Sequence, residues 1–234
     1  MKEKAYKASV YFNFPIQMVE GLINSKEKFL NDIFDYAVYA HSMKLVHGTG
    51  LKKIEAALNY FGVTSRSNEI TLSNGKLLYG KFLRYKSPLV GIHKEMYFDF
   101  YKNEKTDFEI ATLTAFLALK SIMGDKPYMR ISNLFMLSRM DGKLKSVKNI
   151  KELSLSIRKY ATEYYTKKLR NELHDNWGLV YVQSRGVYVS FTLTQFELKT
   201  ATLKESVKSK DRFRSKQMKE ANEEAKKQFN AKQK

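Results

Sequence analysis

The stretch Ile110–Leu119 most constrains the fold of this chain, because it is apolar nearly all round. Directly before it, Thr106-Asp107-Phe108-Glu109 matches a capping box, in which the Thr hydroxyl accepts from the third helical N–H and the Glu reaches back. A helix that is apolar on every side must be buried among other elements. The sequence therefore predicts a core helix over residues 110–123. Because the stretch is about half as long as a bilayer crossing requires, we expect no membrane span.

The first sixty residues predict one strand followed by helices. Residues 4–14 alternate apolar and polar side chains up to Pro15, which is the period of a strand. Residues 16–42 carry apolar side chains at three- and four-residue spacing, which predicts a helix with one buried face and a break near Asn24-Ser25. A further helix is expected over residues 51–61, with Gly62 as its stop.

Residues 68–101 allow two interpretations. Asn74-Gly75 lies between short apolar runs and is a hairpin signal, but residues 77–85 fit the continuation of a helix equally well. The aromatic run at 96–101 is more typical of a strand or a buried turn.

The C-terminal half predicts helices followed by a hairpin. We expect a short strand at 128–131, a helix capped by Ser132 that runs to Met140, and a second helix at 150–159 capped by Asn149. A third helix is expected at 162–175. Two β-rich runs, 179–182 and 187–193, then flank the turn-like tetrad Gln183-Ser184-Arg185-Gly186.

The third helix has two faces of different chemistry. Tyr165, Leu169 and Leu173 recur at i+4 spacing and predict a core-facing side. The residues predicted to face away from the core are Thr166, Lys167, Arg170, Asn171 and His174. Arg and Asn can pair bidentately with guanine and adenine, and Lys can contact phosphate, so this side suits a major groove. A solvated helix face is the alternative explanation.

The segment YATEYYTKKLRNELHDNWGLVYVQSRGVYVSF, residues 160–191, with the helices before it, resembles a winged-helix domain. In that family the last helix usually enters the major groove, and the hairpin wing reaches the backbone or the minor groove. The resemblance implies that the polar side of the third helix reads or positions DNA and that Arg185 is the wing contact. An additional helix at 132–141 and the basic loop after it leave open which helix pair forms the helix-turn-helix.

The charge balance points to a polyanionic partner. Lys and Arg number 42 against 24 Asp and Glu, a formal net charge of +18, and such an excess favours binding to nucleic acid. The loop 143–148 contributes Lys143, Lys145 and Lys148. The tail 204–234 holds eleven Lys or Arg, among them Arg212 and Arg214, and five Asp or Glu. It is expected to be an exposed helix or a disordered arm that follows phosphates.

We therefore predict a mainly α chain with small β elements, an α+β fold. The expected domains are an α-rich N-terminal domain (1–104), a winged-helix-like nucleic-acid-binding domain (105–200) and a basic helical or disordered tail (201–234). The first domain is the expected site of self-association or of a protein partner.

The sequence contains no convincing catalytic constellation. It has no cysteine, and its four histidines form neither HExxH nor a His-x-His pair. Tyr164-Tyr165 suggests a tyrosine nucleophile, with Arg158 and Arg170 near in sequence, but Tyr165 lies on the predicted core-facing side, so packing explains the pair better. We expect no catalytic residue, no metal and no cofactor. The alternative of a metal-dependent nuclease depends on an acidic group made of Asp99, Glu104, Asp107 and Glu109.

The leading hypothesis is a non-catalytic protein that binds duplex DNA, a replication initiator or transcriptional regulator of a microbe, mobile element or phage. It is expected in the cytoplasm, or inside a virion if a phage encodes it. A structural or packaging protein that binds nucleic acid without sequence preference is the second hypothesis. RNA stays open as a partner, because basic and aromatic residues serve single strands equally well.

Overall fold

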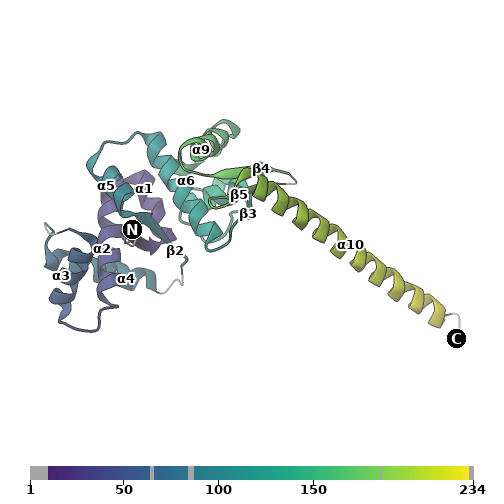
Figure 1. The fold of residues 1–234 in the computed structure, drawn as a ribbon, viewed down its shortest axis with the longest axis horizontal. Helices are drawn as coiled ribbons and strands as arrows, with labels where there is room; N and C mark the ends of the chain where they lie inside the picture. Colours follow the sequence, from purple (N-terminus) through teal and green to yellow (C-terminus); the bar gives the residue numbers. More distant parts are fainter. Residues whose placement is uncertain (1–9, 64–65, 84–86, 185, 232–234) are drawn as a thin grey trace, which may run out of the picture. The chain divides into compact units, whose positions relative to one another are not determined.

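A computed structural model describes residues 10–63, 66–83, 87–184 and 186–231. Contacts divide the chain into two compact units, one of residues 1–125 with 132–178 and one of residues 126–131 with 179–234. The fold is mainly helical with two small sheets, as the sequence predicts (Figure 1). The first unit extends across residue 104. The domain boundary predicted near that residue stays a prediction.

The first unit holds most of the helices. Its elements, in chain order, are β1 (Tyr11–Pro15), η1 (Ile16–Val19), α1 (Glu20–Asn24), α2 (Lys26–Ser42), α3 (Gly50–Phe61), α4 (Asn68–Leu83), β2 (Leu89–His93), α5 (Lys94–Lys102), α6 (Asp107–Met123), α7 (Asn133–Met140), η2 (Ile150–Glu152), α8 (Leu155–Arg158) and α9 (Glu163–Asn176).

Strand β1 anchors the core of this unit. It pairs antiparallel with β2, with Phe12 opposite Ile92 and Phe14 opposite Val90, and all four side chains are buried. The ring of Phe12 stacks on that of Phe61 at 4.6 Å. The predicted strand over 4–14 is thus confirmed from Tyr11 onward, whereas residues 1–9 lie outside the described part of the chain.

Most of the predicted helix ends are confirmed. The break near Asn24-Ser25 is present, and the Ser25 hydroxyl accepts from the backbone N–H of Lys28 to cap α2. Gly62 ends α3 in the left-handed region with φ of 69°. The capping box of α6 has both of its bonds, from Glu109 N–H to the Thr106 hydroxyl and from Thr106 N–H to the Glu109 carboxylate.

The hairpin interpretation of Asn74-Gly75 is wrong, because residues 68–83 form the single helix α4. Gly75 is buried where α4 crosses α2. A Cβ built on it would lie 2.5 Å from the Cβ of Tyr39 and 2.6 Å from the carbonyl oxygen of Asp35. The glycine therefore serves a close approach of two helices rather than a turn.

Two further predictions are corrected by tertiary contacts. Residues 96–101 are not a strand or turn but belong to α5, whose Tyr97 is buried and donates its hydroxyl to the Leu30 carbonyl at 3.1 Å. The helix predicted at 150–159 is interrupted, because Leu153 is buried in extended backbone between η2 and α8.

Helix α6 lies at the centre of the first unit. Its residues Leu113 and Leu117 are fully buried and belong to the main core cluster. The helix packs against η1, α1 and β2 from the N-terminal part and against α7 and α9 from the later part. The predicted core helix is thus confirmed.

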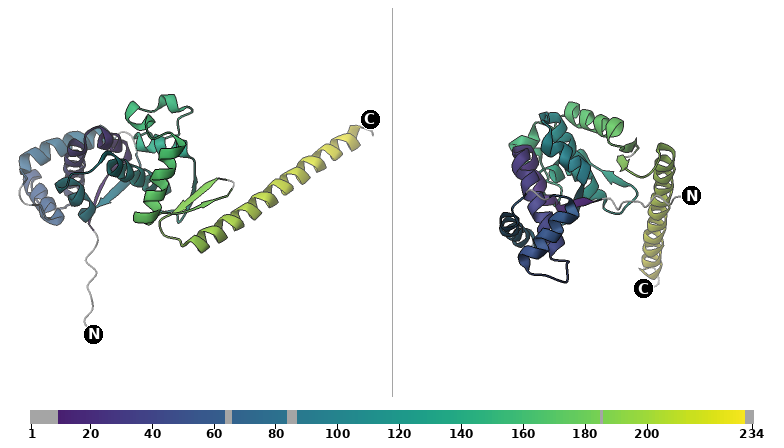
Figure 2. Two further views of the ribbon diagram at one scale, coloured as in Figure 1. Left: turned by 90° about the horizontal axis from the view of Figure 1, so that it is seen from above. Right: turned by 60° about the vertical axis from the view of Figure 1, so that its left-hand side comes forward.

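The second unit is a three-stranded antiparallel sheet followed by one long helix. Its elements are β3 (Met129–Ile131), β4 (Val180–Gln183), β5 (Val187–Ser190) and α10 (Gln195–Ala231). The sheet order is β3-β5-β4, so the strand that precedes α7 pairs with the second strand of the predicted hairpin. Figure 2 shows α10 as one continuous helix that begins beside the sheet and runs away from it.

A largely buried ion pair joins α2 to the segment before α4. Asp35 is 2% exposed, and Arg66 reaches its carboxylate at 2.9 Å and the Asn31 side-chain oxygen at 2.8 Å. Burial raises the pKa of Asp35, and the Arg66 charge opposes that shift. The carboxylate therefore depends on its arginine to stay charged in this position.

Replacing that arginine tests this dependence. We expect Arg66→Met to lower the free energy of unfolding by about 3 kcal/mol, because a buried carboxylate loses its cation. Urea unfolding can be followed through Trp177, the only tryptophan and a residue of the same unit. The control is Lys28→Met, which removes the exposed pair with Asp32 on the same helix α2 and should cost at most about 0.5 kcal/mol. Equal losses in the two variants would contradict the assignment.

Candidate nucleic-acid interface

Helix α9 is fixed by its cap and by one buried side. The Thr162 hydroxyl accepts from the Tyr165 N–H at its start. Leu169 and Leu173 are fully buried, and Thr166 is 1% exposed. The Thr166 hydroxyl donates to the carbonyls of Thr162 and Glu163, so this polar group is satisfied inside the helix.

The orientation predicted for α9 is confirmed for most residues and wrong for two. Lys167, Asn171 and His174 are exposed, as expected. Thr166, predicted on the outer side, is buried and unavailable as a contact. Tyr165, predicted on the core side, is 37% exposed and packs its ring edge-on against Tyr160. The buried side therefore contains Thr166 in place of Tyr165, together with Leu169 and Leu173 as predicted.

The outer side of α9 carries aromatic, basic and amide groups together. Tyr164 is 66% exposed, and Lys167 and Asn171 follow it at i+3 and i+7. Arg170 is half-buried at the border, where its Nε donates to the Thr166 carbonyl at 3.4 Å. Lys168, which the sequence reasoning did not select, places its ammonium 4.3 Å from the centre of the Phe108 ring of α6.

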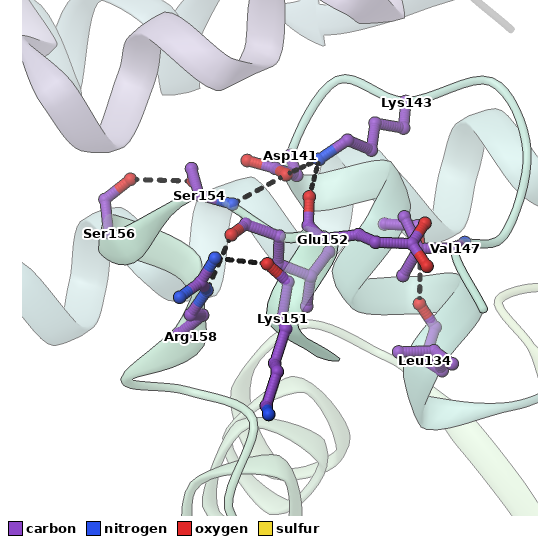
Figure 3. A network of polar contacts seen from close by, with 11 residues as sticks. Leu134, Asp141, Lys143, Val147, Lys151, Glu152, Ser154, Ser156 and Arg158 are labelled. Carbon is purple, nitrogen blue, oxygen red and sulfur yellow. Dashed lines mark hydrogen bonds and ion pairs between the residues drawn. The ribbon is translucent and has the colours of Figure 1, made fainter. Parts of the chain in front are cut away.

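The loop between α7 and α8 is held by one buried carboxylate (Figure 3). Asp141 is 4% exposed, and its Oδ2 accepts from the Ser154 N–H at 3.0 Å and from the Lys143 ammonium. The same ammonium donates to the Glu152 carbonyl at 2.6 Å. Asp141 and Lys143 thus tie both ends of the loop together.

Other polar contacts close the same loop. The Ser138 hydroxyl accepts from the Val147 N–H at 3.0 Å and donates to the Leu134 carbonyl at 2.7 Å. Arg158 donates from Nε to the Leu153 carbonyl at 2.7 Å, and its Nη2 contacts the Lys151 carbonyl. Figure 3 shows the Arg158 contacts on one side of the network and those at Leu134 and Val147 on the other.

The three predicted loop lysines therefore differ in role. Lys143 is an internal tether, so the prediction that it contacts a ligand is not supported by its surroundings. Lys145 and Lys148 are exposed on the loop that the tether holds.

The hairpin tip carries a basic group that the sequence did not indicate. Arg185 lies outside the described residues. Arg130 of β3 pairs with Tyr188, and a Cβ on Gly186 would fall 3.0 Å from the Arg130 Cζ. Its guanidinium therefore lies against the tip. Only the pairing of β3 with β5 reveals this, because the two are far apart in sequence.

Helix α10 confirms the helical alternative for the tail and separates its two predicted arginines. Its start is packed against the sheet by the buried Leu198, whereas the side chains from 203 to 223 are exposed apart from the half-buried Ser206. Basic residues recur at i+4 spacing along one side, at Lys204, Lys208, Arg212 and Lys216. Arg214 is rotated by about 200° from Arg212 and lies with the exposed apolar Val207 and Met218.

The acidic group proposed for a nuclease is divided among separate local contacts. Asp99 pairs with Lys105 at 2.7 Å, and hydrogen bonds from Lys105 and Asn103 lower its pKa. Glu109 caps α6, and hydrogen bonds from Thr106 lower its pKa. Asp107 lies 3.2 Å from the Lys159 ammonium. Within the described ranges, no three His, Asp or Glu side chains are grouped so that they could hold a metal ion.

Comparison with known proteins gives no relative from which to transfer a function. No family of proteins, no characterised protein and no solved structure matches the chain. In the part of the chain that the structure describes, no helix has an apolar stretch long enough to cross a membrane.

Proposed function

We propose that this protein binds duplex DNA without catalysis, with α9 in the major groove and the loop after α7 on the phosphates. The observation that carries the proposal is the outer side of α9. There Lys167, Asn171 and His174 are exposed directly opposite the buried Leu169 and Leu173. An amide can read adenine and an ammonium can contact phosphate from one such helix face.

The order of elements supports a winged-helix-like arrangement. After α6 the chain forms β3, then α7, α8 and α9, and then the β4–β5 hairpin, whose second strand pairs with β3. Sequence-adjacent helices followed by such a hairpin are the pattern on which the resemblance rests. Arg130 beside the tip adds a basic group where a wing would contact the backbone.

The exposed cations outside α9 supply sequence-independent affinity. Lys145 and Lys148 lie on the tethered loop, and the i+4 series on α10 forms a basic side. Neutralising phosphates releases counterions, so this part of the affinity falls steeply with salt.

We place the protein among replication initiators or transcriptional regulators. A packaging role is the second candidate, favoured by the basic side of α10.

The proposal is tested by selecting from a random-sequence duplex library with the full chain, at about 50 mM and about 200 mM salt. A short motif that is enriched at both salt concentrations supports base readout. Uniform retention that collapses at the higher salt favours packaging. No retention at either concentration refutes duplex binding.

Substitutions on α9 separate readout from charge. Asn171→Ala is expected to weaken binding to the selected site by about 5- to 150-fold while leaving random duplex binding unchanged, because it removes a base contact. Lys167→Ala should weaken both and reduce the salt slope by about 1. The matched controls, which should have little effect, are the exposed Asn59→Ala on α3 and Lys76→Ala on α4. The measurement is fluorescence anisotropy of labelled duplexes across a salt series.

The opposite ranking would contradict readout by α9. If Arg212→Glu on α10 weakens binding to every sequence more than either α9 variant does, the packaging role is supported instead.

The loop lysines predict two different kinds of defect. Lys143→Ala should lower the free energy of unfolding by about 1–3 kcal/mol, because the buried Asp141 loses its charged donor. Lys148→Ala should leave unfolding unchanged and weaken duplex binding, with the salt slope reduced by about 1. Urea unfolding and anisotropy of the same preparations check both. Weaker binding by Lys143→Ala with unchanged stability would show that Lys143 contacts DNA after all.

A further inference from the structure

Helix α5 presents basic and aromatic side chains on one side, and the proposed duplex interface does not use it. Lys94, Phe98, Tyr101 and Lys102 recur at i, i+4, i+7 and i+8, which places them on one helix face. The opposite part of the helix carries the buried Phe100. The four side chains therefore form a surface of their own in the first unit.

This face borders a cavity of about 480 Å³. The cavity is lined by Phe34, Gly62, Val63, Arg66, Tyr97, Phe98, Tyr101 and Lys102. Four of these are aromatic, two are cationic, and none of these lining residues is acidic. Its volume is within the range of sites for small molecules, about 300–1,000 Å³.

The aromatic wall is built as a stack. The rings of Tyr97 and Tyr101 are nearly parallel, with centroids 5.9 Å apart and planes at 15°. Tyr97 is buried and held by its bond to the Leu30 carbonyl, whereas Tyr101 is 47% exposed. Tyr101 is therefore an exposed ring on a fixed support, where a further flat ring can stack.

Two lysine ammonium groups lie near this aromatic wall. The ammonium groups of Lys94 and Lys102 lie 6.0 and 5.6 Å from the centre of the Phe98 ring, and neither forms an ion pair with a residue that the structure describes. The Lys94 ammonium lies close to the end of α3, since a Cβ on Gly62 would be 2.6 Å from its Nζ. The partial negative charge of a helix C-terminus favours a cation there.

The two lysines bracket the aromatic wall along the helix axis. They are separated by eight residues, which corresponds to a rise of about 12 Å. Arg66 adds a third positive group, with its guanidinium 4.9 Å above the Phe34 ring, although Asp35 already balances its charge. A ligand that suits this arrangement has a flat ring and an anion on either side of it.

We propose that this cavity binds single-stranded nucleic acid, with one unpaired base stacked on Tyr101 and the flanking phosphates on Lys94 and Lys102. A base within a duplex is covered on both faces by its neighbours and cannot stack in this way, whereas an unpaired base can. Stacking on an aromatic ring tolerates any base and contributes about 1–3 kcal/mol per base. The site is separate from the α9 interface and does not depend on it.

The experiment measures binding of the full chain to a fluorescein-labelled oligothymidylate of about ten nucleotides. Tyr101→Leu should weaken binding by about 5- to 150-fold, and Tyr101→Trp should retain it, because only the latter keeps a stacking ring. The control Tyr60→Leu replaces a tyrosine of α3 that is similarly exposed, at 49%, and lies outside this cavity. Lys102→Gln should reduce the salt slope by about 0.7, and the exposed Lys52→Gln on α3 should not.

A photo-crosslink identifies the contact directly. An oligonucleotide with 5-bromouracil in place of thymine is expected to crosslink to the peptide that contains residues 94–102. Crosslinks confined to other peptides, or equal affinity of Tyr101→Leu and Tyr60→Leu, would refute the site, and a protein ligand for the cavity would then be favoured.

The outcome is distinguishable from that of the duplex proposal. Tyr101→Leu should leave duplex affinity unchanged, and Asn171→Ala should leave oligothymidylate affinity unchanged. Loss of both activities in Tyr101→Leu, with unchanged urea unfolding, would contradict a separate single-strand site.

Discussion

The burial of α6 on all its sides is the constraint on which the first unit depends. An all-round apolar helix cannot lie on a surface, so elements from both ends of the unit must cover it. Its contacts with α1 and β2 on the one hand and with α7 and α9 on the other meet that requirement. The same contacts explain why residues before and after 104 form one compact unit, although the sequence changes composition there. They also fix the buried side of α9, and hence which of its residues face outward.

Features with a local cause were predictable from the sequence. The predicted capping residues Thr106, Ser132 and Asn149 act within three positions of themselves, and the structure shows each bond. The predictions that failed depended on distant partners. Gly75 is a turn signal in isolation, but its role is to admit the backbone of α2. The run at 96–101 is rich in aromatics, yet it is helical with Tyr97 anchored to the Leu30 carbonyl.

In the candidate interface, too, local features of one helix were predictable and those set by its packing were not. Periodicity identified α9 and its amphipathic character, but it placed Tyr165 inside and Thr166 outside. The greater hydrophobicity of tyrosine favours burying Tyr165, but in the structure Thr166 is the buried residue of the two. Threonine can satisfy its hydroxyl with the carbonyls of the preceding turn and so be buried at small cost, while tyrosine keeps its polar end in water at the border. Arg130 was missed for a different reason, since strand pairing across some sixty residues leaves no local signal.

Net charge alone does not reveal which cations are available to a ligand. Lys143 is bound to Asp141 and to a carbonyl, and Arg66 neutralises Asp35. Each of these has an internal electrostatic role and would have to abandon it to contact a phosphate. By contrast, Lys148 and Lys167 are exposed, on the tethered loop and on the capped helix α9 respectively. Ordering such a side chain on a phosphate costs only its own rotamer freedom, because the backbone beneath it is already fixed. In the proposed duplex complex, the tethered loop and the capped helix would therefore contribute to affinity by holding a few exposed cations in place, even though neither Asp141 nor Thr162 would contact the DNA.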